Sequence, residues 1–248
     1  MREKRVVVLV AIMVLTFGAS QTEAQVVITE CTTLEVPGAY VLAGNLTATG
    51  NCLVVGADFV TINLAGWTIT GDGTGAGITD TGVLRRGIVV RNGTVRIFPT
   101  GINLGASLGA QVERVRVNDN ATGILVGNSS TVNSNTATEN NDGIVAGNAS
   151  TVAGNTASSN FVNGILVGNG STIKGNSATG NTGGFMPGAG IVVGSGGTVT
   201  GNTASSNSGN GIRVTCPSNV IGNTATSNTD TNLLLIGEGC NSVNNLAP

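Results

Sequence analysis

The chain has 248 residues, of which 40% are hydrophobic and 10% are charged, and it contains no histidine. Without an imidazole, Ser-His-Asp catalysis and histidine-based metal sites are excluded. The formal net charge of −2 argues against a nucleic-acid partner, because such proteins carry an excess of Lys and Arg.

The N-terminal segment 1–24 has the layout of a secretory signal peptide. Three basic residues precede an apolar run over 6–17, and small and polar residues follow. The run is shorter than the roughly 20 residues that span a bilayer. We therefore expect cleavage, a secreted or periplasmic location, and a mature chain 25–248 without a membrane span. That chain keeps eight basic and eleven acidic residues.

The first part of the mature chain predicts short strands. Residues 25–60 are expected to form N-terminal capping rungs of a β structure. Alternating apolar residues and β-branched side chains favour strands at 40–42, 53–55, 60–64, 87–90 and 101–104.

The segment 71–86 is rich in glycine and predicts a long loop. It contains Asp72, Asp80, Arg85 and Arg86. Loops on a rigid scaffold often carry function, so these charges form one candidate group. The alternative is a simple detour between two rungs.

A repeat of about 21 residues dominates the C-terminal half, and we place regular repeats over 101–235. Copies start at Gly123, Gly143, Gly164, Gly190 and Gly211. In each copy, apolar residues occupy alternate positions after the leading Gly. A short segment with one Val or Ile follows, and then a segment centred on Ala. A period of this length is typical of a stacked solenoid. Three short strands per turn predict a parallel β-helix with a triangular section.

Two asparagines recur in every copy and predict ladders along the stack. Identical amides on successive turns can hydrogen-bond to one another, and Asn is tolerated at sharp corners. The first ladder is expected at Asn135, Asn155, Asn176, Asn202 and Asn223, and the second at Asn140, Asn160, Asn181, Asn207 and Asn228.

The four cysteines form two pairs near the two ends. Cys31 and Cys52 are 21 residues apart, and Cys216 and Cys240 are 24 apart. Each spacing is close to one turn of the repeat, which places the partners on neighbouring rungs and within disulfide reach. Export makes two disulfides the expected state, and metal-binding thiolates are the alternative.

These features resemble the right-handed parallel β-helix proteins of the pectate-lyase-like superfamily. The resemblance rests on the repeats and on the opening strings ITECTTLEVPGAYVLAGNLTATGNCLVV, VTINLAGWTITGDG and IVVRNGTVRIF. The similar group is exported and includes periplasmic copper-related factors of nitrous oxide reductase maturation. The resemblance implies an all-β, single-stranded solenoid with about 21 residues per rung. It does not imply one activity, because fold does not determine function.

Some members of the superfamily cleave acidic polysaccharides, using calcium held by carboxylates together with an Arg or Lys base. The candidates here for catalysis and for calcium are Asp119, Glu139 and Asp142, which the repeat brings to neighbouring corners. Arg114 and Arg116 are near in sequence. The alternative is that all five are solvated surface charges. None matches a catalytic motif of the family, and the chain offers no soft ligands for copper.

Two features predict a binding surface. The outward position after each leading Gly forms a column that reads Val89, Asn103, Leu125, Val145, Leu166, Val192, Arg213 and Leu234. An outward aliphatic stripe suggests contact with another chain, a lipid-like ligand or a covering segment. Strand propensity alone is the alternative. Phe185 and Met186, which lie in an insertion in one repeat, are further candidates for binding.

The sequence therefore predicts an exported, non-catalytic β-helix that presents a long surface to a polysaccharide or an envelope protein. Two alternatives stay open. One is a polysaccharide lyase or glycoside hydrolase that uses the carboxylates named above. The other is a structural or adhesive solenoid that oligomerises through the aliphatic stripe.

Overall fold

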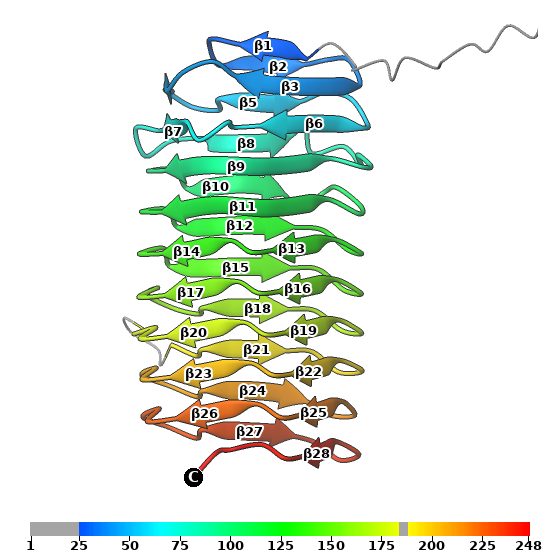
Figure 1. The fold of residues 1–248 in the computed structure, drawn as a ribbon, viewed down its shortest axis with the longest axis vertical. Coiled ribbons are helices and arrows are strands. Elements are labelled where there is room, and N and C mark those ends of the chain that lie inside the picture. Colours follow the sequence, from blue (N-terminus) through cyan, green and yellow to red (C-terminus); the bar gives the residue numbers. More distant parts are fainter. Residues whose placement is uncertain (1–24, 184–187) are drawn as a thin grey trace, which may run out of the picture.

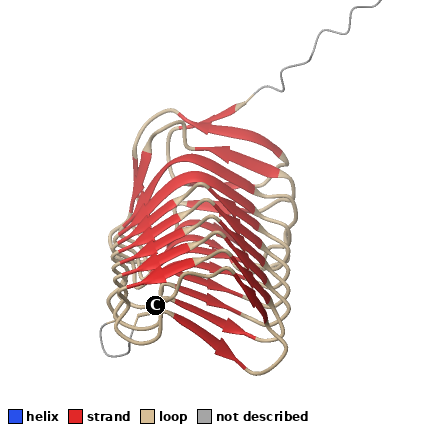
Figure 2. Cartoon of the chain, turned by 60° about the horizontal axis from the view of Figure 1, so that its bottom comes forward, coloured by secondary structure: helices blue, strands red, loops and turns tan. Residues whose placement is uncertain are grey.

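A computed structural model of the chain describes residues 25–183 and 188–248. These residues form a right-handed parallel β-helix whose turns stack along one axis (Figure 1), which confirms the expected fold class. Every strand pair is parallel, and strands of successive turns lie over one another when the C-terminal end is brought forward (Figure 2). The signal expected at 1–24 and the candidates Phe185 and Met186 lie outside the described residues.

One sheet, which we call sheet B, contains a single strand from each of ten turns. Its strands are β2 (Thr32–Leu34), β5 (Leu53–Val55), β8 (Ala76–Asp80), β10 (Thr100–Leu104), β12 (Thr122–Val126), β15 (Asp142–Ala146), β18 (Ile165–Val167), β21 (Ile191–Val193), β24 (Ile212–Thr215) and β27 (Leu233–Ile236).

The other 18 strands form sheet A, which folds over two faces of the solenoid. Its N-terminal strands are β1 (Val26–Ile28), β3 (Gly38–Leu42), β4 (Leu46–Thr47), β6 (Val60–Asn63), β7 (Thr68–Thr70), β9 (Val89–Arg96) and β11 (Gln111–Asn118). Two short strands then come from each turn: β13 (Thr131–Asn133), β14 (Thr136–Thr138), β16 (Thr151–Ala153), β17 (Thr156–Ser158), β19 (Thr172–Lys174), β20 (Ser177–Thr179), β22 (Thr198–Thr200), β23 (Thr203–Ser205), β25 (Asn219–Ile221), β26 (Thr224–Thr226), with β28 (Asn241–Val243) in the last turn.

The core is a set of columns of small and β-branched side chains. Because side chains of a strand alternate between its faces, each short strand sends one or two residues inward. The isoleucine column of sheet B and the alanine column of sheet A are both almost completely buried. They comprise Ile124, Ile144, Ile165, Ile191 and Ile212, and Ala137, Ala157, Ala178, Ala204 and Ala225. No turn encloses these residues alone, so stacking provides the core.

Both asparagine ladders are present, as predicted. In the first ladder, each side-chain amide donates to the next side-chain oxygen over 2.9–3.0 Å. In the second, the corresponding distances are 2.8–3.1 Å, starting at Asn120 and ending at Asn232. The ladders satisfy polar groups that the sharp corners bury.

The two cysteine pairs are disulfides, which confirms the expected pairing and rules out the thiolate alternative for these residues. Cys31 and Cys52 have Cα atoms 4.4 Å apart, and Cys216 and Cys240 have Cα atoms 5.0 Å apart. Each disulfide joins neighbouring turns near one end of the described solenoid.

Two local predictions were wrong. The segment 71–86 is not one loop, because β8 lies inside it and pairs with β5 and β10 as a regular rung of sheet B. Val89 belongs to sheet A, where it pairs with Thr61 and Gln111, so it does not extend the aliphatic column. The described residues contain no helix with the length and apolar character needed to cross a membrane.

Candidate functional site

The candidate site lies on sheet A, where β9 and β11 run without interruption around the corner between two faces. Each has eight residues, whereas later turns cover the same path with two strands of three residues. The two strands pair from Gln111 opposite Val89 to Asn118 opposite Arg96, except at Asn92 and Arg114, which turn the corner with left-handed backbones. Side chains on both sides of this corner therefore stand in register.

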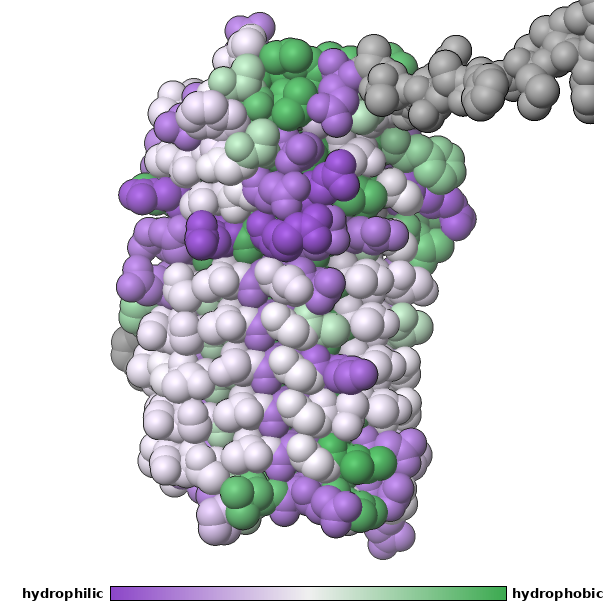
Figure 3. All heavy atoms as spheres, in the orientation of Figure 1, coloured by the Kyte–Doolittle hydropathy of each residue, from purple (hydrophilic) through white to green (hydrophobic). Residues whose placement is uncertain are grey.

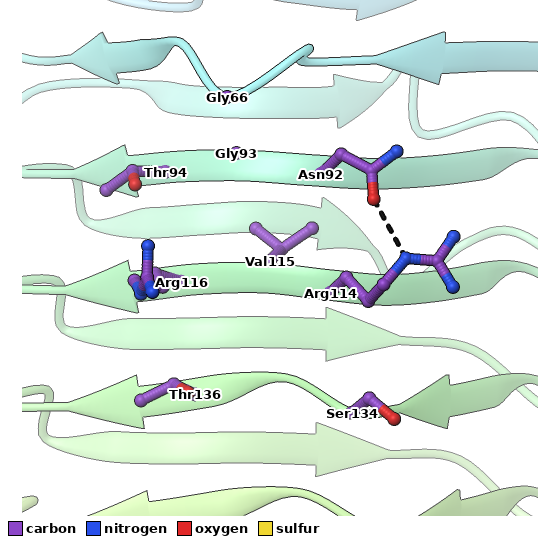
Figure 4. Close-up of a pocket in the computed structure, with 9 residues that line it drawn as sticks. All are labelled: Gly66, Asn92, Gly93, Thr94, Arg114, Val115, Arg116, Ser134 and Thr136. Atoms are coloured by element: carbon purple, nitrogen blue, oxygen red, sulfur yellow. Dashed lines mark hydrogen bonds between the residues drawn. The ribbon is translucent and has the colours of Figure 1, made fainter.

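A groove of about 330 Å³ crosses this corner. We call it the corner groove, and Figure 4 shows its lining. It is lined by Gly66, Asn92, Gly93, Thr94, Arg114, Val115, Arg116, Ser134 and Thr136, which come from four successive turns. A Cβ added at Gly66 would meet no atom within 4 Å, so this glycine leaves space at the groove, whereas a Cβ at Gly93 would meet Leu64 of the core. The two arginines and the hydroxyl groups supply hydrogen-bonding groups to the lining.

Arg114 has an unusual backbone for its residue type. Its φ is +51°, in the left-handed region, as it is at the equivalent corner residues Asn92, Ser134 and Asn244, while four other turns place a glycine there. A left-handed conformation costs a non-glycine residue about 1–2 kcal/mol. Its side chain is ordered by Asn92, whose Oδ1 accepts from Nε over 2.9 Å, and by an ion pair with Glu113. The ordered guanidinium beside the groove makes Arg114 a candidate binding residue.

The strands of the groove also carry a concentration of positive charge. Arg91 and Arg96 lie on β9, and Arg114 and Arg116 lie on β11. We call these four residues the arginine band. Figure 3 shows a strongly hydrophilic belt across this face at the level of the two strands. The neighbouring strands of sheet A (β6, β7, β13 and β14) contain no charged residue.

The structure brings together some predicted site residues and adds others. Arg114 and Arg116 both line the corner groove. Arg91 and Arg96 were missed, because their strand was expected to end at residue 90. A signal for them exists in the sequence, since six of the eight basic residues after position 24 lie between Arg85 and Arg116.

The three candidate carboxylates lie elsewhere and do not line the groove. Asp119 and Glu139 are exposed corner residues of neighbouring turns, each with a φ of +58°. Asp142 is half-buried, and its Oδ1 accepts hydrogen bonds from the amide and the side chain of Asn163 at 3.2 and 3.0 Å. Among the described residues, no group of three His, Cys, Asp or Glu side chains is placed to hold a metal ion.

Replacing Glu139 with glycine is expected to stabilise the protein. Glu139 is exposed and left-handed, and the equivalent corner two turns later is Gly180, with a φ of +64°. Relief of the backbone strain exceeds the extra entropy of glycine in the unfolded chain, for a net gain of about 1 kcal/mol. Urea denaturation measures the change, and an unchanged or lower free energy of unfolding would contradict it.

The segment 71–86 uses its charged residues to shape turns. Asp80 is buried and accepts hydrogen bonds from the Ser107 hydroxyl at 2.8 Å and the Gly82 amide at 3.0 Å. Asp72 accepts bonds from the hydroxyl and the amide of Thr74, and these bonds hold its pKa below the usual value. Both carboxylates thus have local structural partners.

The aliphatic column on sheet B exists in part. Leu125, Val145, Leu166 and Val192 stand opposite one another in successive strands, and each is half-buried. Asn103, Arg213 and Leu234 stand in the same column, so polar residues lie on either side of these four and Leu234 lies beyond Arg213. The stripe is therefore one residue wide and bounded by polar side chains.

Comparison with known proteins identifies a family and a fold. The family model described as "Periplasmic copper-binding protein (NosD)" matches residues 51–190, more than half of the chain. No curated protein matches the sequence.

Three solved structures share the fold at low identity. The mannuronan C-5 epimerase AlgE6 A-module of Azotobacter vinelandii is 19% identical, with a TM-score of 0.58, and the match covers 80% of this chain and 71% of that chain. The Dettilon tailspike protein is 17% identical, with a TM-score of 0.59 and coverage of 89% and 53%. A mutant of the periplasmic alginate epimerase AlgG is 16% identical, with a TM-score of 0.50 and coverage of 81% and 60%. At these identities the likeness shows the β-helix alone.

The residues of this chain do not fit a copper site. Copper in proteins favours imidazole, thiolate and thioether ligands. The chain has no histidine, and its four cysteines are held in two disulfides. The three methionines lie outside the described residues.

Proposed function

We propose that this chain, which belongs to the family of the periplasmic copper-binding protein NosD, is a periplasmic β-helix. In this proposal it binds a polysaccharide and leaves it chemically unchanged. The corner groove is the observation that carries the proposal. It crosses four successive turns and is about 330 Å³ in volume. A groove of this form suits an elongated ligand that contacts several turns at once.

The lining of the groove suits sugars. The hydroxyl groups of Thr94, Ser134 and Thr136 and the amide of Asn92 donate and accept hydrogen bonds, as sugar hydroxyls require. Trp67 directly follows Gly66 of the groove and is 40% exposed. An exposed indole offers an apolar face against which a sugar ring can pack.

The same lining supports binding more than cleavage. Glycoside hydrolysis typically uses two carboxylates, and the nine lining residues include none. Glu113, beside Arg114 in the chain, is already paired with that arginine. A calcium-dependent lyase would need carboxylates beside its arginine base, and Asp119, Glu139 and Asp142 lie outside the groove.

The proposal predicts retention of the protein by a polysaccharide without turnover. Affinity electrophoresis through gels that contain single polysaccharides measures retention, and assays for new reducing ends and for unsaturated ends, with and without calcium, measure turnover. We expect retention by at least one polysaccharide and no new ends. Failure to be retained by any of them, or the appearance of new ends, would overturn the proposal.

The matched variants are Trp67→Ala and Phe59→Ala. Both side chains are aromatic and exposed, by 40% and 65%, but Phe59 is not part of the groove. Trp67→Ala is expected to weaken retention about tenfold through the lost ring contact. Phe59→Ala is expected to leave retention unchanged, and equal losses would argue against the groove.

A further inference from the structure

We propose that the arginine band is a binding site for a polyanionic polysaccharide whose sugars carry carboxylates. This inference rests on the function proposed above and names the class of ligand. Arg91, Arg96, Arg114 and Arg116 form the site, and they lie in and beside the corner groove. Carboxylates are the natural partners of guanidinium groups, which bind them through paired N–H donors.

The first argument is the uneven distribution of charge. The chain carries an overall net charge of −2, yet the span from Arg85 to Arg116 holds six basic residues and one acidic residue, Glu113. Arg85 and Arg86 lie at another corner, where the amide of Arg86 donates to the carboxylate of Asp58. The excess on sheet A therefore comes from the arginine band itself.

The second argument is the geometry of the band. Paired strands lie about 4.8 Å apart, and diagonal neighbours about 7–8 Å apart. Arg116 pairs with Thr94, so it is a diagonal neighbour of Arg96. This separation falls within the Debye length of about 8 Å at physiological ionic strength, so the charges of Arg96 and Arg116 act together on an approaching polyanion.

The third argument is how little of this charge is neutralised. Within residues 25–183 and 188–248, the single ion pair joins Arg114 to Glu113. Arg91 and Arg96 are half-buried, and their Nε atoms are buried without a hydrogen-bond partner. Partial burial restricts these side chains before any ligand arrives, which lowers the entropy cost of binding.

The fourth argument is the position of Arg114 at the corner. Its φ of +51° is the left-handed conformation that this corner also has at Asn92, Ser134 and Asn244, and at Gly154. Its side chain lines the corner groove, and its Nε donates to Asn92 Oδ1 over 2.9 Å. The guanidinium is therefore held at the groove before a ligand arrives, which lowers the entropy cost of binding.

The test compares polygalacturonate with its methyl ester, which has the same backbone without the negative charge. The full chain is measured by affinity electrophoresis at low and at physiological salt. We expect retention by polygalacturonate, weaker retention at higher salt, and little retention by the ester. Equal retention by both polymers, or binding to uncharged glycans only, would overturn the inference and leave the proposed function standing. Absence of retention by any polysaccharide would overturn the proposed function itself.

Charge-matched variants assign the site. Arg96→Gln with Arg116→Gln removes two charges from the band, and Lys174→Gln with Arg213→Gln removes two charges from outside it. We expect the first pair to weaken binding about tenfold or more and the second to leave it unchanged. The single variant Arg116→Gln changes an exposed side chain only. It keeps the test valid if the double variant does not fold, and it is expected to weaken binding in the same direction. Equal losses in both pairs would show a general effect of charge and overturn the assignment.

Arg114→Gly separates a binding role from a structural one. The change removes a guanidinium and relieves a left-handed backbone, so we expect a higher melting temperature together with weaker binding to polygalacturonate. Glu139→Gly relieves the same kind of strain outside the groove and is expected to raise the melting temperature without weakening binding. If Arg114→Gly bound as tightly as Glu139→Gly, the inference would be overturned.

Discussion

Replacing Asn155 with alanine is expected to lower the free energy of unfolding by about 4 kcal/mol. Asn155 is buried in the middle of the first ladder, where its Oδ1 accepts from the main-chain amide of Asn135 at 2.9 Å and from its side chain at 3.0 Å. Its own side chain donates to the carbonyl oxygen of Val132 at 2.9 Å. Alanine leaves these groups buried without partners, and each one costs about 1–3 kcal/mol. Urea denaturation monitored by circular dichroism measures the loss.

The control for this prediction is Asn245→Ala at the last position of the same ladder. Asn245 accepts the same two hydrogen bonds from Asn223, at 2.9 Å each, but it is only half-buried. Water can replace its amide there, so the expected loss is about 1 kcal/mol. Equal losses for the two variants would mean that burial does not determine how much each ladder asparagine contributes to the free energy of unfolding.

The ladder shows why so much of this fold was predictable from sequence. A solenoid repeats one local solution, so each inward residue and each corner asparagine appears at the same place in every copy. Strand alternation then identifies Ile144 or Ala157 as inward without knowledge of the rest of the molecule. The disulfides followed from the same period, because one turn separates Cys31 from Cys52.

The site was less predictable, because it lies where the repeat is least regular. β9 and β11 continue around a corner that later turns break at Ser134, at a glycine or at Asn244, and no copy of the repeat predicts this. The sequence pattern predicts a strand that ends at residue 90, so it does not assign Arg91 and Arg96 to a face of the solenoid. The register that joins them to Arg114 and Arg116 involves pairing across 22 residues, which local patterns do not contain.

Replacing Gly143 with alanine is expected to cost about 3 kcal/mol. Gly143 leads its repeat within β15, where it is buried against the next turn. An added Cβ would lie 2.6 Å from the carbonyl oxygen of Gly164 and 2.9 Å from the side-chain nitrogen of Asn160. The first atom belongs to the residue before β18 and accepts a hydrogen bond from the Ile144 amide, and the second belongs to an asparagine ladder, so neither moves without breaking hydrogen bonds of the stack. Urea denaturation measures the change.

Gly44→Ala is the matched control. A Cβ at Gly44 meets no atom within 4 Å, and its φ lies outside the left-handed region. Alanine there restricts the unfolded chain without strain and is expected to add about 0.5 kcal/mol of stability. Opposite signs of the two changes in stability would show that glycine is required at position 143 because neighbouring turns approach closely there, and not because glycine is flexible. A small effect at Gly143 would instead mean that neighbouring turns can separate to admit a methyl group, and that the ladder tolerates such a shift.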